Sequence, residues 1–127
     1  MKRILIVDDD VVIRIAFKKL LGDGDFIIQQ AKDVKEAINM LSNNIYNLVL
    51  LDLRLPPTGI DAGFDILAKK RKIPLNASTP VLIVSGQTAD RTLLENKVDL
   101  EDNVVDILIK PIENEDLLKA IRNALAL

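Results

Sequence analysis

The sequence predicts a doubly wound α/β domain, and two observations lead to this fold class. Four short apolar runs have the length and β-branched content of strands that are buried on both faces, and they cover residues 4–7, 48–53, 81–84 and 104–109. Segments with helical periodicity separate these runs. Because strands that alternate with helices form βαβ crossovers, we expect one parallel sheet with helices on both faces.

A weaker apolar run and a first helix complete the N-terminal part of this pattern. Residues 26–31 form a fifth predicted strand, preceded by Gly22 and Gly24 as turn residues. The first helix is expected from about residue 11 to residue 21. Its inward-facing residues are expected to be Ile13, Ala16, Phe17 and Leu20.

The remaining helices differ in how clearly they are marked. Asp33 and Glu36 resemble a capping box, and the apolar spacing of the second helix gives one stripe made of Val34, Ala37, Ile38 and Leu41. A third helix is expected from about residue 64 to residue 72 and a fourth near 89–97. The closing helix is amphipathic, with Leu117, Leu118, Ile121 and Leu125 on one side and Lys119, Arg122 and Asn123 on the other.

Length and composition predict one domain, residues 1–127, and exclude several functions. The 17 basic and 19 acidic residues give a formal charge of −2, and no basic cluster indicates direct binding to nucleic acid. The chain has no cysteine and no histidine, which excludes disulfides, thiolate sites and histidine-based triads or zinc sites. No stretch approaches the roughly 20 apolar residues of a membrane span, so a cytoplasmic protein is expected.

Polar residues with complementary chemistry end four of the five predicted strands. Asp8, Asp9 and Asp10 follow the first strand, and Asp52 lies at the end of the third. The last two strands end in Ser85-Gly86 and Lys110-Pro111. Ligands of doubly wound sheets bind outside the carboxyl ends of the strands, so these residues are expected to form one site.

The residue types of this site favour phosphoryl chemistry. Carboxylates about 4 Å apart repel by roughly 4 kcal/mol at an effective dielectric near 20, so a cation is expected among them. Oxygen ligands alone indicate a hard ion such as Mg²⁺. Lys110 is suited to a phosphate oxygen and Ser85 can donate a hydrogen bond to another, while Asp52 is the candidate nucleophile for an aspartyl phosphate.

These motifs resemble the receiver domains of bacterial response regulators across essentially the whole chain. The run from Ile4 to Asp10, with Arg14 beyond it, is similar to the family's first strand and acidic pair, and 50–56 is similar to its phosphoacceptor segment. Val84-Ser85-Gly86 resembles its Ser/Thr switch position, and Ile109-Lys110-Pro111 its lysine followed by a cis proline.

The resemblance implies a flavodoxin-like (βα)5 fold with strand order 2-1-3-4-5, which acts as a signalling domain rather than an enzyme. Asp8, Asp9, Asp52 and the backbone carbonyl of Arg54 would bind Mg²⁺. Asp52 would accept a phosphoryl group from a histidine kinase or histidine phosphotransfer protein. Ser85 and Lys110 would then contact the phosphate and remodel the face of helix four, strand five and helix five, a face that is also a possible homodimer interface.

Three features depart from the family pattern. The loop from Pro56 to Gly63 is longer than usual, and Ile107 replaces the usual aromatic switch residue of strand five. Asp99 to Asn103 replaces the usual small-residue turn before that strand. No output domain is recognised, so the chain is expected to be a stand-alone receiver or part of a longer regulator or hybrid kinase.

Other interpretations stay open at this point. Asp8 and Asp10 form the Asp-x-Asp pair of haloacid-dehalogenase-like phosphohydrolases, which would make Asp8 the nucleophile but leaves Asp52 unexplained. A degenerate receiver that only binds a partner is a second alternative. Asp10 taken alone is a helix N-cap, while Arg54 and Gln87 either influence access to the phosphate or are simply solvated.

Overall fold

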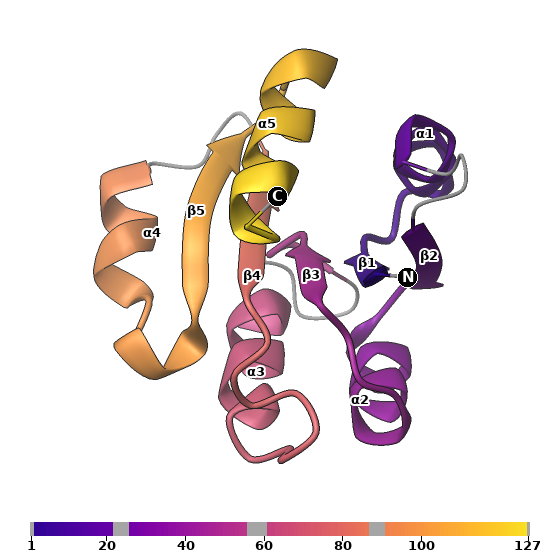
Figure 1. Cartoon of the computed structure of the whole chain (residues 1–127). Coiled ribbons are helices and arrows are strands. Elements are labelled where there is room, and N and C mark those ends of the chain that lie inside the picture. The colour runs from indigo at the N-terminus through magenta and orange to yellow at the C-terminus, as the bar shows by residue number, and fades with distance from the viewer. Residues whose placement is uncertain (1, 22–25, 56–60, 87–90, 127) are drawn as a thin grey trace.

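The computed structural model describes residues 2–21, 26–55, 61–86 and 91–126. Within them, one parallel sheet has the strand order β2-β1-β3-β4-β5, which confirms the expected topology (Figure 1). The strands are β1 (Lys2–Val7), β2 (Phe26–Ala31), β3 (Leu48–Leu51), β4 (Val81–Ser85) and β5 (Val104–Ile109).

Helices cover both faces of this sheet. In Figure 1, α1 and α5 lie on one side of the sheet, while α2 and α3 lie on the other, and α4 packs beside β5. The helices are α1 (Val11–Leu21), α2 (Val34–Asn43), α3 (Asp61–Lys70), α4 (Arg91–Lys97) and α5 (Asn114–Ala124), with a short 3-10 helix η1 (Leu100–Asp102) before β5.

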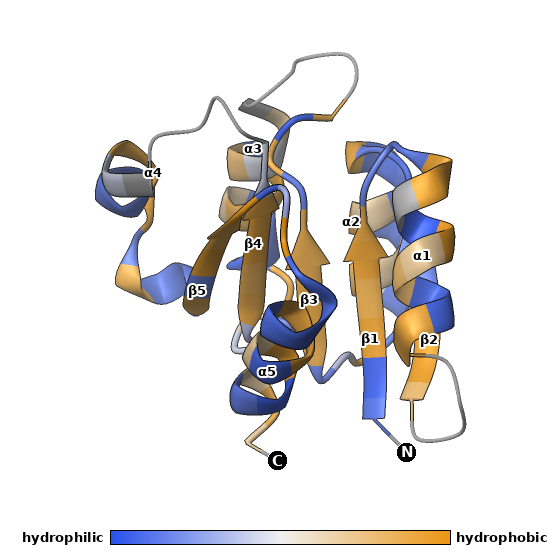
Figure 2. Cartoon of the chain, turned by 90° about the horizontal axis from the view of Figure 1, so that it is seen from above, coloured by the Kyte–Doolittle hydropathy of each residue, from blue (hydrophilic) through white to orange (hydrophobic). Residues whose placement is uncertain are grey.

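The strand β1 shows why the apolar runs are continuous. Ile4 and Ile6 point into the core beneath α1 and α5, whereas Leu5 and Val7 point into the core beneath α2 and α3. Successive side chains of a strand face opposite sides, so a strand covered on both sides needs apolar residues at every position. Figure 2 shows the apolar strands running toward one common edge between helices with one polar side.

Several helix and strand details differ from the expectation. Ala16 was expected to face inward but is exposed, because α1 turns Phe17, Leu20 and Leu21 toward the core instead. The strand expected over 48–53 ends at Leu51, since the carboxylate of Asp52 accepts a hydrogen bond from the backbone N–H of Arg54 and turns the chain. The third helix begins earlier and ends earlier than expected, at Asp61 and Lys70.

The first turn of α3 packs directly against the segment that follows Asp52. The backbone N–H of Gly63 donates to the carbonyl of Leu53 at 2.9 Å. A side chain at Gly63 would place its Cβ only 2.5 Å from the Cα of Leu53, so only glycine permits this approach. The close contact fixes the chain on one side of the site.

The turn before β5 forms the 3-10 helix η1. Asp99 and Asp102 make a reciprocal capping box, and Asn103 adopts the left-handed conformation with φ 57°. Asp102 is buried and pairs with Arg71, which directly follows α3. This region, where the sequence departs from the receiver pattern, is therefore tied to α3 by charge.

Candidate functional site

The predicted site residues come together at the carboxyl edge of the sheet. Val7 pairs with Leu51 at the ends of β1 and β3, so Asp8 and Asp52 follow neighbouring strands. Ser85 pairs with Ile109 at the ends of β4 and β5, so Ser85 lies beside Lys110. Gln87 and residues 56–60 of the long loop lie outside the described residues.

Three carboxylates form the centre of the site. One oxygen from each of Asp8, Asp9 and Asp52 lies within 4.8 Å of the others. Asp8 is only 2% exposed and Asp52 8%, whereas Asp9 is exposed. The cluster is therefore buried on the sheet side and reached from solvent past Asp9.

Lys110 supplies a positive charge to this cluster. Its Nζ lies 3.2 Å from Oδ2 of Asp8 and 3.3 Å from Oδ2 of Asp52. The backbone N–H of Lys110 donates to the carbonyl of Ser85 at 2.6 Å, and the Lys110–Pro111 peptide bond is cis, as predicted. Lys110 thus bridges the two buried carboxylates.

The environment changes the ionisation of both partners of this bridge. Burial raises the pKa of Asp52 above 3.8, an effect that Asp8 adds to, while Lys110 and the backbone N–H of Arg54 oppose it. Burial alone would lower the pKa of Lys110, but the carboxylates of Asp8 and Asp52 together raise it. The lysine therefore stays protonated at neutral pH.

The turn from β1 into α1 orients Asp8. The Oδ1 of Asp8 accepts from the backbone N–H of Asp10 at 2.9 Å, and Oδ1 of Asp10 accepts from that of Val12, also at 2.9 Å. Asp10 is thus the N-cap of α1, as predicted for this residue taken alone. The guanidinium of Arg14 donates to the backbone carbonyl of Asp8, a contact that the sequence analysis did not assign.

The main chains of Ser85 and Arg54 form hydrogen bonds within the site. Ser85 is buried at the end of β4, and among the described residues no hydrogen bond joins its hydroxyl to the carboxylates. Arg54 donates its backbone N–H to Oδ1 of Asp52 at 3.1 Å, while its side chain is exposed. The predicted roles of the Ser85 hydroxyl and the Arg54 carbonyl stay predictions.

The donor set suits a hard divalent cation. Three carboxylates and one ammonium leave one positive and three negative charges at this edge. A divalent cation would balance that excess, and carboxylate oxygens are the ligands that Mg²⁺ prefers. The residues present therefore fit Mg²⁺.

Comparisons with known proteins indicate the family to which this chain belongs. A family model described as the response regulator receiver domain matches residues 4–122. Protein PetR of Rhodobacter capsulatus is 33% identical over 118 residues, which cover 93% of this chain and 46% of PetR. Transcriptional regulatory protein DltR of Streptococcus agalactiae is 32% identical over 120 residues, which cover 94% of this chain and 50% of DltR. The chain spans about half the length of these curated relatives.

Solved structures show the same similarity over the whole fold. A CheY-like response regulator receiver domain protein from Methanospirillum hungatei matches with a TM-score of 0.82 and 28% identity, covering 99% of this chain and 94% of that one. The non-phosphorylated HemR receiver domain of Leptospira biflexa matches with a TM-score of 0.81 and 28% identity, covering 100% and 96%.

The matches distinguish a receiver domain from a phosphohydrolase, two interpretations that the sequence left open. Receiver domains are signalling domains of two-component systems, phosphorylated by histidine kinases, and they bind Mg²⁺ at an acidic pocket. A phosphohydrolase with Asp8 as nucleophile is not favoured. Among the described residues, no helix is long and apolar enough to cross a membrane. The chain belongs to the response regulator receiver domain family.

Proposed function

We propose that residues 1–127 form one receiver domain in which Asp52 accepts a phosphoryl group from a phosphohistidine. One observation carries this proposal: the ammonium of Lys110 bridges the buried carboxylates of Asp8 and Asp52 within an acidic cluster at the sheet edge. Such a bridge combines ligands for a divalent cation with a fixed cation for a phosphate.

The strand order supports Asp52, rather than Asp8, as the acceptor. β3 lies between β1 and β4, so Asp52 has the acidic pair on one side and Ser85 and Lys110 toward the other. Asp8 follows β1, whose other neighbour β2 ends in Ala31, and Asp33 beyond β2 caps α2 and is not part of the acidic cluster. Asp52 therefore stands between the acidic pair and the strand that carries Ser85, which supports its role as the acceptor.

The residues divide the chemistry between them. Asp8, Asp9, Asp52 and the carbonyl of Arg54 would hold Mg²⁺, which when bound neutralises charge on the oxygens of the transferred phosphoryl group. An oxygen of Asp52 forms the bond to phosphorus as the phosphorus–nitrogen bond of the donor imidazole breaks, and the imidazole takes up a proton. Lys110 and Ser85 then contact the phosphate oxygens.

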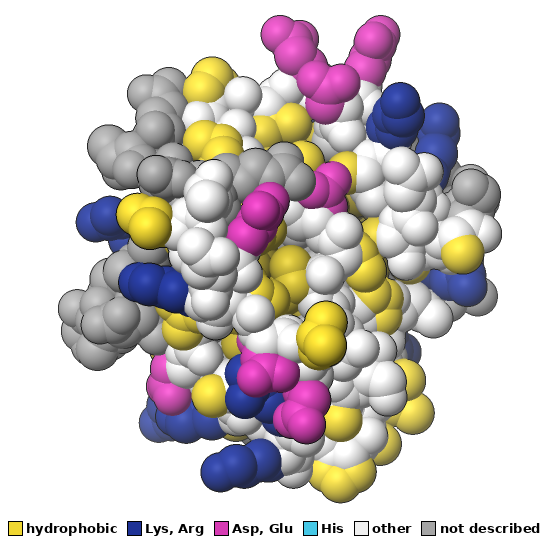
Figure 3. All heavy atoms as spheres, turned by 90° about the vertical axis from the view of Figure 1, so that its left-hand side faces the viewer, with side chains coloured by type: hydrophobic (Ala, Val, Ile, Leu, Met, Phe, Trp, Pro, Cys, Tyr) yellow, Lys and Arg dark blue, Asp and Glu magenta, His cyan; other side chains and the backbone are white. Residues whose placement is uncertain are grey.

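The output of the switch is proposed to be the face formed by α4, β5 and α5. A pocket between α4 and β5 is lined by Val98, Val104 and Ile107 together with the carboxylates of Glu95 and Asp106. Figure 3 looks onto this side of the molecule and shows hydrophobic atoms at its surface beside acidic side chains. Because Leu100 on the same side is 98% exposed, this face is suited to a partner or to a second copy of the chain.

Phosphorylation by a small donor tests the proposal without a cognate kinase. The chain is incubated with phosphoramidate and Mg²⁺, and intact mass is measured for the wild type, Asp52→Asn, Asp8→Asn and the exposed control Asp65→Asn. We expect one added phosphoryl group in the wild type and in Asp65→Asn, none in Asp52→Asn, and slower labelling in Asp8→Asn. Labelling that survives in Asp52→Asn but disappears in Asp8→Asn contradicts the proposal and favours the phosphohydrolase.

A further inference from the structure

We infer that Arg14 is a positioning residue for the acidic pair. Its guanidinium holds the peptide group between Asp8 and Asp9 so that the carboxylate of Asp9 points into the cluster. The inference rests on the proposed function for the identity of the ion that the cluster binds. It adds a residue outside the ligand set, in α1, to the determinants of metal affinity.

Arg14 holds the turn between β1 and α1 by both its side chain and its main chain. Nη1 of Arg14 donates to the carbonyl oxygen of Asp8 at 2.9 Å. The backbone N–H of Arg14 donates to the carbonyl of Asp10 at 3.0 Å. The first of these bonds depends on the arginine side chain, whereas the second is the first backbone hydrogen bond of α1 and does not.

The orientation of this peptide group matters most for Asp9. The carbonyl of Asp8 belongs to the rigid plane that joins Asp8 to Asp9, so a bond to this oxygen sets the direction in which the Asp9 side chain leaves the chain. The carboxylate of Asp8 is already held by Asp10 and Lys110. Among the described residues, the carboxylate of Asp9 has no hydrogen bond that would hold it, so its direction depends on the main chain.

The buried Nε atom of Arg14 indicates that fold stability alone does not call for an arginine here. The Nε atom is buried and has no hydrogen-bond partner among the described residues. A buried N–H without an acceptor opposes folding. A methionine, which is shorter and carries no N–H, would avoid this unfavourable term, so Arg14→Met is expected to keep the thermal midpoint while it loses the contact with Asp8.

A purely electrostatic role predicts the opposite effect on metal binding. A fixed positive charge beside the acidic pair repels a cation, so its removal alone would strengthen Mg²⁺ binding. Arg14→Lys keeps this charge but replaces the planar guanidinium with a shorter-reaching ammonium. Positioning predicts weaker binding in both variants, whereas a charge effect predicts tighter binding in Arg14→Met and no change in Arg14→Lys.

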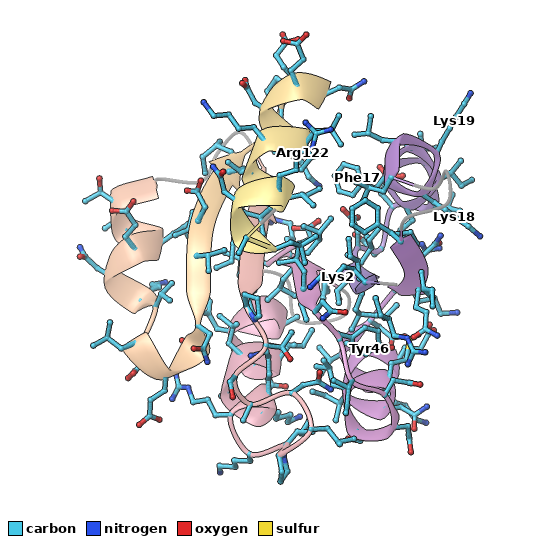
Figure 4. All side chains as sticks on the ribbon, viewed as in Figure 1. Lys2, Phe17, Lys18, Lys19, Tyr46 and Arg122 are labelled. Carbon is cyan, nitrogen blue, oxygen red and sulfur yellow. The ribbon has the colours of Figure 1, made fainter. Side chains whose placement is uncertain are left out.

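The test is a titration of the metal-free full chain with Mg²⁺ alone, in which binding is measured from the amide chemical shifts in NMR spectra. The control is Lys18→Met, which removes an exposed cation one turn further along α1, where Lys18 projects outward from the molecule (Figure 4). We expect the dissociation constant to rise about tenfold in both Arg14 variants and to stay unchanged in Lys18→Met. Labelling with phosphoramidate should approach the wild-type rate once Mg²⁺ is saturating.

Three results overturn the inference. They are wild-type affinity in both Arg14 variants, tighter binding in Arg14→Met, or a loss of affinity matched by a lower thermal midpoint in both variants. A wild-type chain that neither binds Mg²⁺ nor becomes labelled instead contradicts the proposed function itself. The wild-type control thus separates the two failures.

Discussion

The two edges of the sheet differ in how completely their buried polar groups are paired. At the carboxyl edge, three carboxylates share one ammonium, and negative charge remains in excess. At the opposite edge, the buried side chain of Asn76 uses its full hydrogen-bonding capacity. Its Nδ2 donates to the carbonyls of Leu41 and Asn44, and its Oδ1 accepts from the N–H of Tyr46 and the hydroxyl of Thr79.

This difference separates a stabilising region from a reactive one. Completely paired polar groups join α2, β3 and β4 without any need for a ligand. Incompletely balanced charge lowers stability but leaves coordination sites for a cation and a phosphoryl group. Substitutions at the opposite edge, the amino edge, should therefore lower stability and spare phosphorylation, whereas substitutions at the carboxyl edge should impair phosphorylation without lowering stability.

The largest effect is expected from Asn76→Ala. The substitution removes four hydrogen bonds, three of them buried, so the free energy of unfolding should fall by about 4 kcal/mol. Urea unfolding measures this loss, with the exposed Asn123→Ala as control. Under conditions where the variant is folded, labelling of Asp52 by phosphoramidate should persist. A loss of labelling with unchanged stability would break the contrast between the two edges.

Lys70, also far from the site, should make stability depend on pH. It is 1% exposed at the end of α3, and burial lowers its pKa from 10.5 to about 8, although Asp102 partly opposes this. Below pH 8 both the folded and the unfolded chain carry this proton, and the folded chain must keep the ammonium buried. Above pH 8 the folded chain loses this proton while the unfolded chain still keeps it, so the free energy of unfolding should rise with pH.

The variant Lys70→Met isolates this effect. It should be more stable than the wild type by about 2 kcal/mol at neutral pH, and the difference should shrink as pH rises above 8. Measurements should stay below pH 10, because the raised pKa of Tyr46 gives the opposite trend above that value. Urea unfolding at several pH values gives the comparison. A constant difference across this range would show that Lys70 does not titrate in the folded chain.

The sequence predicts the carboxyl edge better than the amino edge, for a physical reason. Asp8, Asp52, Ser85 and Lys110 each follow or end an apolar run, so strand order alone brings them together. The partners of Asn76 lie 30 or more residues away at Tyr46 and Leu41, and no local pattern marks them.

Side-chain burial on helices was harder to predict than strand ends. Lys70 is buried although lysines rarely are, and Ala16 is exposed although it fits the apolar stripe of α1. Both outcomes depend on how each helix is rotated against the sheet, which is set by contacts between distant segments. The contact of Arg14 with Asp8 could not be predicted for the same reason, because the direction of the guanidinium depends on how α1 packs against the sheet.

The smallest effect, and the sharpest test of the carboxyl edge, comes from Asp52→Asn without metal. Because burial raises the pKa of Asp52, the folded chain holds this proton to a higher pH than the unfolded chain does, and ionisation of Asp52 costs stability as pH rises above 3.8. The amide has no charge to bury, so Asp52→Asn should be more stable at pH 7 by on the order of 1 kcal/mol. Thermal midpoints measured in the presence of a chelator report this gain in stability, which should shrink as the pH is lowered toward 3.8.

The exposed pair of Asp65 and Lys69 supplies the matched control for this prediction. Their charged atoms lie 3.0 Å apart, but both side chains are about half exposed, so Asp65→Asn should change stability by only about 0.3 kcal/mol. Charge removal should therefore stabilise the chain at the buried cluster and be nearly neutral on the surface of α3. If Asp52→Asn proves less stable than the wild type, the bridge to Lys110 outweighs the burial of charge, and the carboxyl edge is a stabilising region like the opposite one.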